Sequence, residues 1–136
     1  MKCLLDVSTL VALGIAEHEF HERVANWIRD LGAAEPLELA TCSITEIGFV
    51  RIVAQTPQYA FNISEARILL LGLKARHGEV FTFIADDHDA TRLPGWVKGP
   101  KQVTDGHLVQ LAKANGAVLA TLDRGIPGAF LIPGTT

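Results

Sequence analysis

Short apolar segments alternate with amphipathic segments along the chain, and this alternation constrains the possible folds more than any other feature. Five apolar runs have the length and residue types of buried strands, at residues 2–5, 37–41, 80–84, 117–122 and 129–132. Between them, apolar side chains recur at helical spacing within residues 8–16, 17–31, 43–54, 64–76 and 105–115. Strands that alternate with helices predict an α/β fold with a mainly parallel sheet. The chain has 136 residues and is 49% hydrophobic, which suits one domain over residues 1–136 with a sizeable core.

The last predicted helix, its turn and the following strand form a unit with an acid at each end. The helix begins at Asp105 and stops at Asn115-Gly116, and Asp123 follows the strand. A helix of about eleven residues rises roughly 16 Å, and a strand of about six residues returns roughly 20 Å. The chain therefore doubles back, and we expect Asp123 to lie near Asp105. Neighbouring carboxylates repel each other and raise each other's pKa, so this arrangement is costly without a cation.

Acids follow the predicted strands at several points. Asp6 follows the first strand, and Glu46 lies in the first turn of the helix after the second strand. Ligands of parallel sheets bind beyond the carboxyl ends of the strands, so Asp6, Glu46, Asp105 and Asp123 should gather at one edge. Asp86 and Asp87 also follow a strand, and the edge argument alone does not exclude them. Several oxygen ligands in one place are typical of a hard cation such as Mg²⁺.

Each acid also has an ordinary structural explanation. Asp6 could cap the helix that follows it, and Ser43 to Glu46 fits the capping-box pattern. Asp105 could be a first-turn acid favoured by the helix dipole, and Asp123 could be a turn residue. Independent caps have no reason to meet at one place, whereas a metal ion requires several ligands together. The joint arrangement therefore favours a metal site.

Other polar residues near the acids are candidates for supporting roles. Three hydroxyl side chains could orient metal-bound water: Ser8, Thr104 and Thr121. Ordinary capping and strand propensity explain these hydroxyls equally well. Arg51 lies five residues after Glu46 and could balance the acids or contact phosphate. His18 and His21 do not form the HExxH zinc motif, and we expect both to be mostly solvated.

Composition and motifs narrow the class of protein. The net charge of −3 argues against strong non-specific binding of nucleic acid. No run approaches the length of a membrane span, and the first residues do not resemble a secretory signal, so we expect a soluble, cytoplasmic protein. Cys3 and Cys42 lie in apolar runs and are expected to be buried free thiols. The dinucleotide, P-loop and nucleophile-elbow motifs are absent from the sequence.

Three stretches together resemble a PIN domain of the VapC toxin type: LLDVSTLVAL, ITEIGFVRIV and VTDGHLVQLAKANGAVLATLDRGI. The resemblance implies a three-layer α/β/α sandwich and an endoribonuclease that depends on Mg²⁺ or Mn²⁺ and hydrolyses RNA phosphodiester bonds. The family's four acids would be Asp6, Glu46, Asp105 and Asp123. The resemblance also implies that the third strand lies at the sheet's margin, which makes Asp86 and Asp87 structural. It further implies a homodimer and a cognate VapB-like antitoxin that blocks the acidic cleft.

Two positions depart from the family's usual pattern. Ser8 stands where Asn is frequent, and a serine can still hydrogen-bond a ligated water. Gly106 stands where Ala is more usual, which should loosen the start of the last helix slightly. Neither departure removes an acid.

Two other functions remain as alternatives. The acidic cleft could belong to a non-catalytic binding module that docks a basic protein partner. An enzyme that forms an aspartyl phosphate would place a second acid two residues after Asp6, where Ser8 stands instead.

Overall fold

The computed structural model describes residues 1–76 and 81–134. Its five strands form one sheet in the order β3-β2-β1-β4-β5, and every pairing is parallel. The strands are β1 (Lys2–Leu5), β2 (Glu38–Cys42), β3 (Phe81–Ile84), β4 (Val118–Thr121) and β5 (Phe130–Leu131). The predicted parallel sheet and the marginal position of β3 are confirmed. Val80, the predicted first residue of the third strand, lies outside the described residues.

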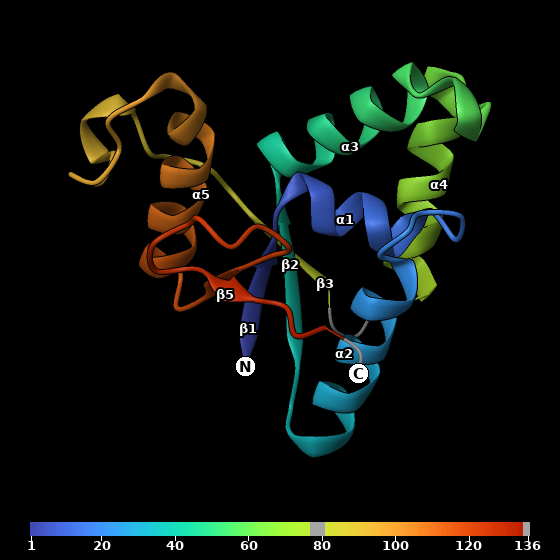
Figure 1. Ribbon diagram of the computed structural model, residues 1–136, viewed down its shortest axis with the longest axis horizontal. Helices are drawn as coiled ribbons and strands as arrows, with labels where there is room; N and C mark the ends of the chain where they lie inside the picture. The colour runs from blue at the N-terminus through green and yellow to red at the C-terminus, as the bar shows by residue number, and fades with distance from the viewer. Residues whose placement is uncertain (77–80, 135–136) are drawn as a thin grey trace.

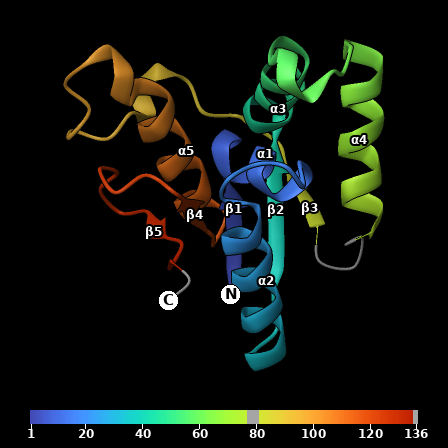
Figure 2. The same cartoon turned by 45° about the vertical axis from the view of Figure 1, so that its right-hand side comes forward.

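Helices cover both faces of this sheet. They are α1 (Val7–Gly14), α2 (His21–Ala34), α3 (Ser43–Gln55), α4 (Ile63–Arg76) and α5 (Val103–Ala114). Figures 1 and 2 show α5 on one side of the sheet and α1 to α4 on the other. This arrangement confirms the three-layer α/β/α sandwich. None of the helices within residues 1–76 and 81–134 combines the length and apolar character that crossing a membrane requires.

The two layers of helices pack on separate apolar cores because successive side chains of a strand point to opposite faces. On β1, Cys3 and Leu5 belong to the larger core, which α1 to α4 complete. Leu4, between them, belongs to the smaller core beneath α5, together with Leu108 and Leu111. Cys3 and Cys42 are both buried and free, as predicted.

Side-chain bonds at the helix starts differ in part from the sequence prediction. At α3 the Cys42 N–H donates to Thr45 Oγ1 (3.0 Å), so the side chain that accepts from the N-cap backbone is Thr45 and not Glu46. The capping box considered as an alternative for Ser43 to Glu46 does not form, because the N-cap is Cys42, one residue earlier than that pattern requires. Glu46 is thus free for other contacts.

The helix-turn-strand unit folds as expected. Gly116 has a positive φ of 68°, a conformation that glycine adopts without the steric cost of a side chain. The chain reverses there, and β4 pairs with β1 through three residue pairs.

Gly106 has a packing role that the sequence pattern did not indicate. It is buried in α5, and a Cβ atom at this position would lie 2.3 Å from Val97 Cγ2. The loop before α5 therefore approaches the helix at a point where only a glycine leaves room.

Candidate active site

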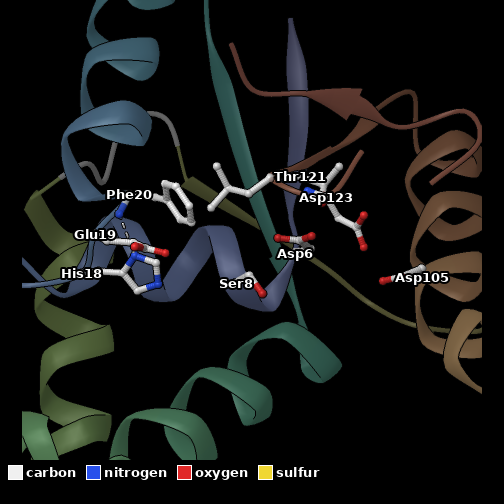
Figure 3. A pocket seen from close by; sticks show the side chains of 9 residues that line it. Asp6, Ser8, His18, Glu19, Phe20, Asp105, Thr121 and Asp123 are labelled. Carbon is white, nitrogen blue, oxygen red and sulfur yellow. Dashed lines mark hydrogen bonds between the residues drawn. The ribbon is translucent and has the colours of Figure 1, made fainter. Parts of the chain in front are cut away.

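Three aspartates from different parts of the chain line one pocket. Asp6 follows β1, Asp105 lies in the first turn of α5, and Asp123 follows β4. All three positions lie beyond the carboxyl ends of parallel strands or beside them, as the sheet argument predicted. The pocket has a volume of about 350 Å³, and Figure 3 shows the three carboxylates on one side of it. Its other described lining residues are Ser8, His18, Glu19, Phe20, Thr121 and Leu122.

Asp6 also caps α1. The Thr9 N–H donates to Asp6 Oδ1 at 2.9 Å, so the ordinary capping role considered for this acid is real. The Asp6 N–H donates to Ala120 O (3.2 Å), which fixes the end of β1 against β4. The cap holds the Asp6 side chain in a single orientation, and Asp6 is 8% exposed. Capping and participation in the pocket are therefore compatible in this side chain.

The pKa of Asp105 is shifted by its surroundings in the pocket. Burial raises the pKa of Asp105 above its ordinary value, and the neighbouring carboxylates Asp6 and Asp123 raise it further. Asp123 is held by its own turn, since the Gly125 N–H donates to Asp123 Oδ1 at 2.9 Å. The sequence prediction that Asp105 and Asp123 approach each other is confirmed by their shared pocket.

Glu46 does not line this pocket. Its Oε2 accepts a hydrogen bond from Thr41 Oγ1 (2.5 Å) and an ion-pair contact from Lys74 Nζ (2.6 Å). Lys74 comes from α4, on the side of α3 away from α5. The structure therefore brings three of the four predicted acids together, while the fourth carboxylate faces a lysine.

Of the four predicted supporting residues, two line the pocket and two do not. Ser8 and Thr121 line the pocket, and Thr121 Oγ1 accepts the Asp123 N–H at 3.0 Å. Thr104 is exposed and is not among the described lining residues. Arg51 is also exposed and lines a separate groove between α3 and the start of α4. Ser8 and Thr121 are thus the hydroxyls placed to assist the acids.

Residues of the turn before α2 complete the pocket, and the sequence reasoning missed them. His18, Glu19 and Phe20 line it opposite Asp105 (Figure 3). The sequence pattern places them within the predicted second helix (residues 17–31), whereas the helix of the structure begins at His21. An aromatic residue between two histidines in a polar stretch was the one signal that could have drawn attention to them.

Asp86 lies outside the pocket and has a structural partner. Burial opposes ionisation of Asp86, but hydrogen bonds from the His88 N–H and the His107 side chain lower its pKa below the ordinary value. The pair between Asp86 and His107 joins the segment after β3 to α5. Asp87 has an 88% exposed side chain and is not among the described residues that line the pocket.

The donor set suits a hard divalent cation. Carboxylate and hydroxyl oxygens line the pocket. Burial raises the pKa of Asp105, and repulsion from Asp6 and Asp123, which a cation would relieve, raises it further. Within the described residues, no three His, Cys, Asp or Glu side chains converge on one ligand position. Mg²⁺ usually binds through one or two carboxylates and keeps several waters, so a pocket of this kind fits it.

Comparison with known proteins gives the family. Residues 3–129 match the PIN domain family. The chain is 41% identical to ribonuclease VapC38 of Mycobacterium tuberculosis over 90% of its own length and 86% of that protein. It is 38% identical to ribonuclease VapC44 and 35% identical to ribonuclease VapC29 from the same species, each over 100% of this chain and at least 95% of the relative.

Solved structures agree on the fold. The VapBC2 complex of Rickettsia felis, bound to a DNA fragment from its promoter, contains a chain with TM-score 0.59 and 15% identity, covering 96% of this chain and 97% of that one. The toxin VapC20 of M. tuberculosis, which cleaves the sarcin-ricin loop, has TM-score 0.58 and 14% identity, covering 94% and 96%. The chain belongs to the PIN domain family and, within it, to the VapC-type ribonucleases.

Proposed function

We propose that the chain is a metal-dependent endoribonuclease that hydrolyses RNA phosphodiester bonds and is the toxin of a VapBC-type toxin–antitoxin pair. The observation that carries the chemistry is the pocket lined by Asp6, Asp105 and Asp123, in which burial and the two neighbouring carboxylates raise the pKa of Asp105. Ribonuclease relatives at 35–41% identity over nearly the whole chain support the reaction class.

Asp6, Asp105 and Asp123 would hold Mg²⁺ or Mn²⁺. When bound, the ion supplies Lewis-acid charge for phosphodiester hydrolysis. The cap from Asp6 to Thr9 and the turn at Asp123 fix two of the carboxylates before any ion arrives. The hydroxyls of Ser8 and Thr121 line the same pocket and would orient water near the carboxylates.

Glu46 remains the proposed fourth acid. It lies in the first turn of α3, just beyond the carboxyl end of β2, the strand that pairs with β1. The Lys74 ammonium balances its charge in this arrangement. Glu46 would therefore bind the metal ion only after its ion pair with Lys74 breaks. A substitution of Lys74 is a useful control, because it removes the ion pair and keeps the carboxylate.

The proposal includes protein partners: a VapB-like antitoxin and a second copy of the chain in a homodimer, within the cytoplasm. Four apolar side chains on α3 and α4 are each more than half exposed: Ile47, Ile63, Ile68 and Leu71. Apolar groups gathered in this way are typical of surfaces that protein partners cover. Light scattering of the purified chain tests the dimer, and co-purification with the product of the adjacent reading frame tests the antitoxin.

The decisive test of the reaction is metal-dependent cleavage of RNA. We expect cleavage of total RNA by the purified chain, loss of cleavage with EDTA, and recovery with Mg²⁺ or Mn²⁺. Asp105→Asn should be inactive under every condition and controls for a contaminating nuclease. Binding of a basic protein partner without any cleavage would instead identify a non-catalytic binding module.

A further inference from the structure

The acid pocket has a second end that the metal chemistry does not use. In Figure 3, the rings of His18 and Phe20 stand on the side opposite Asp105, with Ser8 between them and the carboxylates in this view. Phe20 is 36% exposed, a high value for a large aromatic side chain that lines a pocket.

The turn that carries these rings is held in place by its own hydrogen bonds. The Phe20 N–H donates to His18 Nδ1 (3.0 Å), and the His18 N–H donates to Ile15 O (3.0 Å). The Arg23 guanidinium lies 5.7 Å from the centre of the Phe20 ring and is itself anchored by Ile132 O. The aromatic end of the pocket is thus formed before any ligand binds.

The hydrogen bond to Phe20 also defines what His18 can offer. Because Nδ1 accepts, a neutral His18 ring carries its hydrogen on Nε2, which is a donor. Burial lowers the pKa of His18 below its ordinary value, which favours the neutral ring. His18 therefore presents a neutral N–H donor beside the partly exposed Phe20 ring.

The charge of the pocket explains why such groups would matter. Its described lining includes four acids, Asp6, Glu19, Asp105 and Asp123, and no Lys or Arg. These side chains give a polyanion no Coulomb attraction, so at the end of the pocket away from the proposed ion affinity has to come largely from uncharged contacts. A stacked base and a neutral hydrogen-bond donor are contacts of this kind.

We infer that Phe20 and His18 form a nucleobase subsite, in which Phe20 stacks on a base next to the cleaved phosphodiester and the His18 Nε2–H donates to that nucleotide. The inference rests on the proposed ribonuclease function and names its substrate more closely. A base is free to stack on a side chain where it is unpaired, so the substrate is single-stranded RNA or a loop.

The first experiment measures affinity for a base and for a phosphate chain separately. The probes are a short single-stranded oligoribonucleotide that contains 2-aminopurine and an abasic oligomer of the same length. Both are titrated in Mg²⁺ against the Asp105→Asn protein, which does not cleave, and against the same protein with Phe20→Leu or Phe20→Trp. We expect Phe20→Leu to weaken binding of the base-containing probe about tenfold and to abolish the 2-aminopurine fluorescence change. Phe20→Trp should preserve both.

Two features separate stacking from a general structural effect. The abasic probe should bind equally well with and without the Phe20→Leu substitution, and the dependence of affinity on salt should not change, because stacking releases no counterions. Phe61→Leu is the matched control, since Phe61 is a partly buried phenylalanine that is not among the described lining residues. His18→Asn can still accept the Phe20 N–H through an Asx turn, but it lacks the imidazole donor and should weaken binding of the base-containing probe.

The second experiment measures cleavage with the otherwise unaltered protein. Phe20→Leu should raise KM about tenfold and change kcat much less. If the wild-type protein cleaves RNA and Phe20→Leu alters neither KM nor the fluorescence signal, the subsite is wrong while the ribonuclease function stands. If the wild-type protein never cleaves but binding still depends on Phe20, the ribonuclease function fails and the base subsite survives. If no probe containing bases binds better than the abasic oligomer, the subsite is overturned directly.

Discussion

At the scale of single residues, Asp6 combines two roles. One of its carboxylate oxygens accepts the Thr9 N–H and starts α1, and the same side chain lines the acid pocket. A helix cap orients a carboxylate without neutralising it, because the backbone N–H groups carry only partial charge. A structural explanation of a residue therefore does not exclude a functional one, and the substitutions that separate them have to preserve the cap.

Glu46→Gln tests the fourth acid. Glutamine keeps the size of the side chain but loses the negative charge and is a weaker ligand for a hard metal. We expect a folded variant with much less RNA cleavage, partly recovered at higher Mn²⁺. Lys74→Met is the matched control, because it removes the same ion pair and leaves the carboxylate in place. Wild-type cleavage by Glu46→Gln at limiting metal would remove Glu46 from the site.

Gly106→Ala should destabilise the protein although alanine is the better helix former. The new Cβ would lie 2.3 Å from Val97 Cγ2, a short branched side chain that cannot swing away easily. Overpacking of this kind costs about 1–3 kcal/mol. Gly72→Ala in α4 is the matched control, with no atom within 4 Å, and should raise stability by about 0.5–1 kcal/mol.

Chemical denaturation measures both glycine variants. Adding Val97→Ala to Gly106→Ala should restore part of the lost stability, since it removes the atom that the new Cβ meets. Equal gains from Gly106→Ala and Gly72→Ala would show that the loop yields at no cost.

At the scale of elements, the unit from α5 to β4 brings two acids together that are far apart in the sequence. Gly116 reverses the chain in a left-handed conformation, and β4 then lies beside β1 in the sheet. The two acids either have separate local roles, at the start of α5 and in the turn after β4, or hold one ion together. Substituting the two acids separately and together distinguishes these roles.

Asp105→Asn and Asp123→Asn should be non-additive. If both carboxylates hold the same ion, either substitution alone should remove nearly all metal-dependent cleavage, and the double variant should lose little more. Acids that serve only as caps would instead give stability losses on the order of 1 kcal/mol each that add, with cleavage retained. RNA cleavage at saturating Mn²⁺ and thermal melting, measured on all four proteins, distinguish the two cases.

At the scale of the whole molecule, the acid pocket should lower the stability of the metal-free protein, and a bound cation should restore it. Asp105 is harder to ionise in the folded chain than in the unfolded chain, because burial and the charges of Asp6 and Asp123 oppose it. The folded state therefore binds this proton more tightly. Without metal, stability should fall as pH rises from the ordinary pKa of the carboxyl through the raised one.

Asp105→Asn should consequently raise the melting temperature of the metal-free protein at neutral pH. It should also remove most of the stabilisation that Mg²⁺ gives the wild-type protein, which is about 2.7 kcal/mol when the free ion exceeds its Kd a hundredfold. Thermal melting in EDTA and in millimolar Mg²⁺, across pH, measures both effects. A variant that is clearly less stable than the wild type without metal would show that Asp105 serves mainly to start α5.

Local sequence patterns are sufficient to predict the parallel α/β architecture and to bring three of the four acids to one place. Periodicity fixes which segments are strands and helices, and parallel strands bring their carboxyl ends to one edge, so Asp6, Asp105 and Asp123 could be placed together without coordinates. The same reasoning predicted the reversal at Gly116. These features depend on local spacing and on the single direction of the strands.

The side chains that complete the pocket, and the one predicted acid that lies outside it, depend instead on contacts between distant parts of the chain. Glu46 is paired with Lys74, 28 positions away, and the turn of His18 and Phe20 folds over the pocket from the end of α1. Gly106 is required because Val97 packs against it. Contacts of this kind join elements that are distant in sequence, and their energy depends on close packing and charge pairing in three dimensions, which no local pattern records.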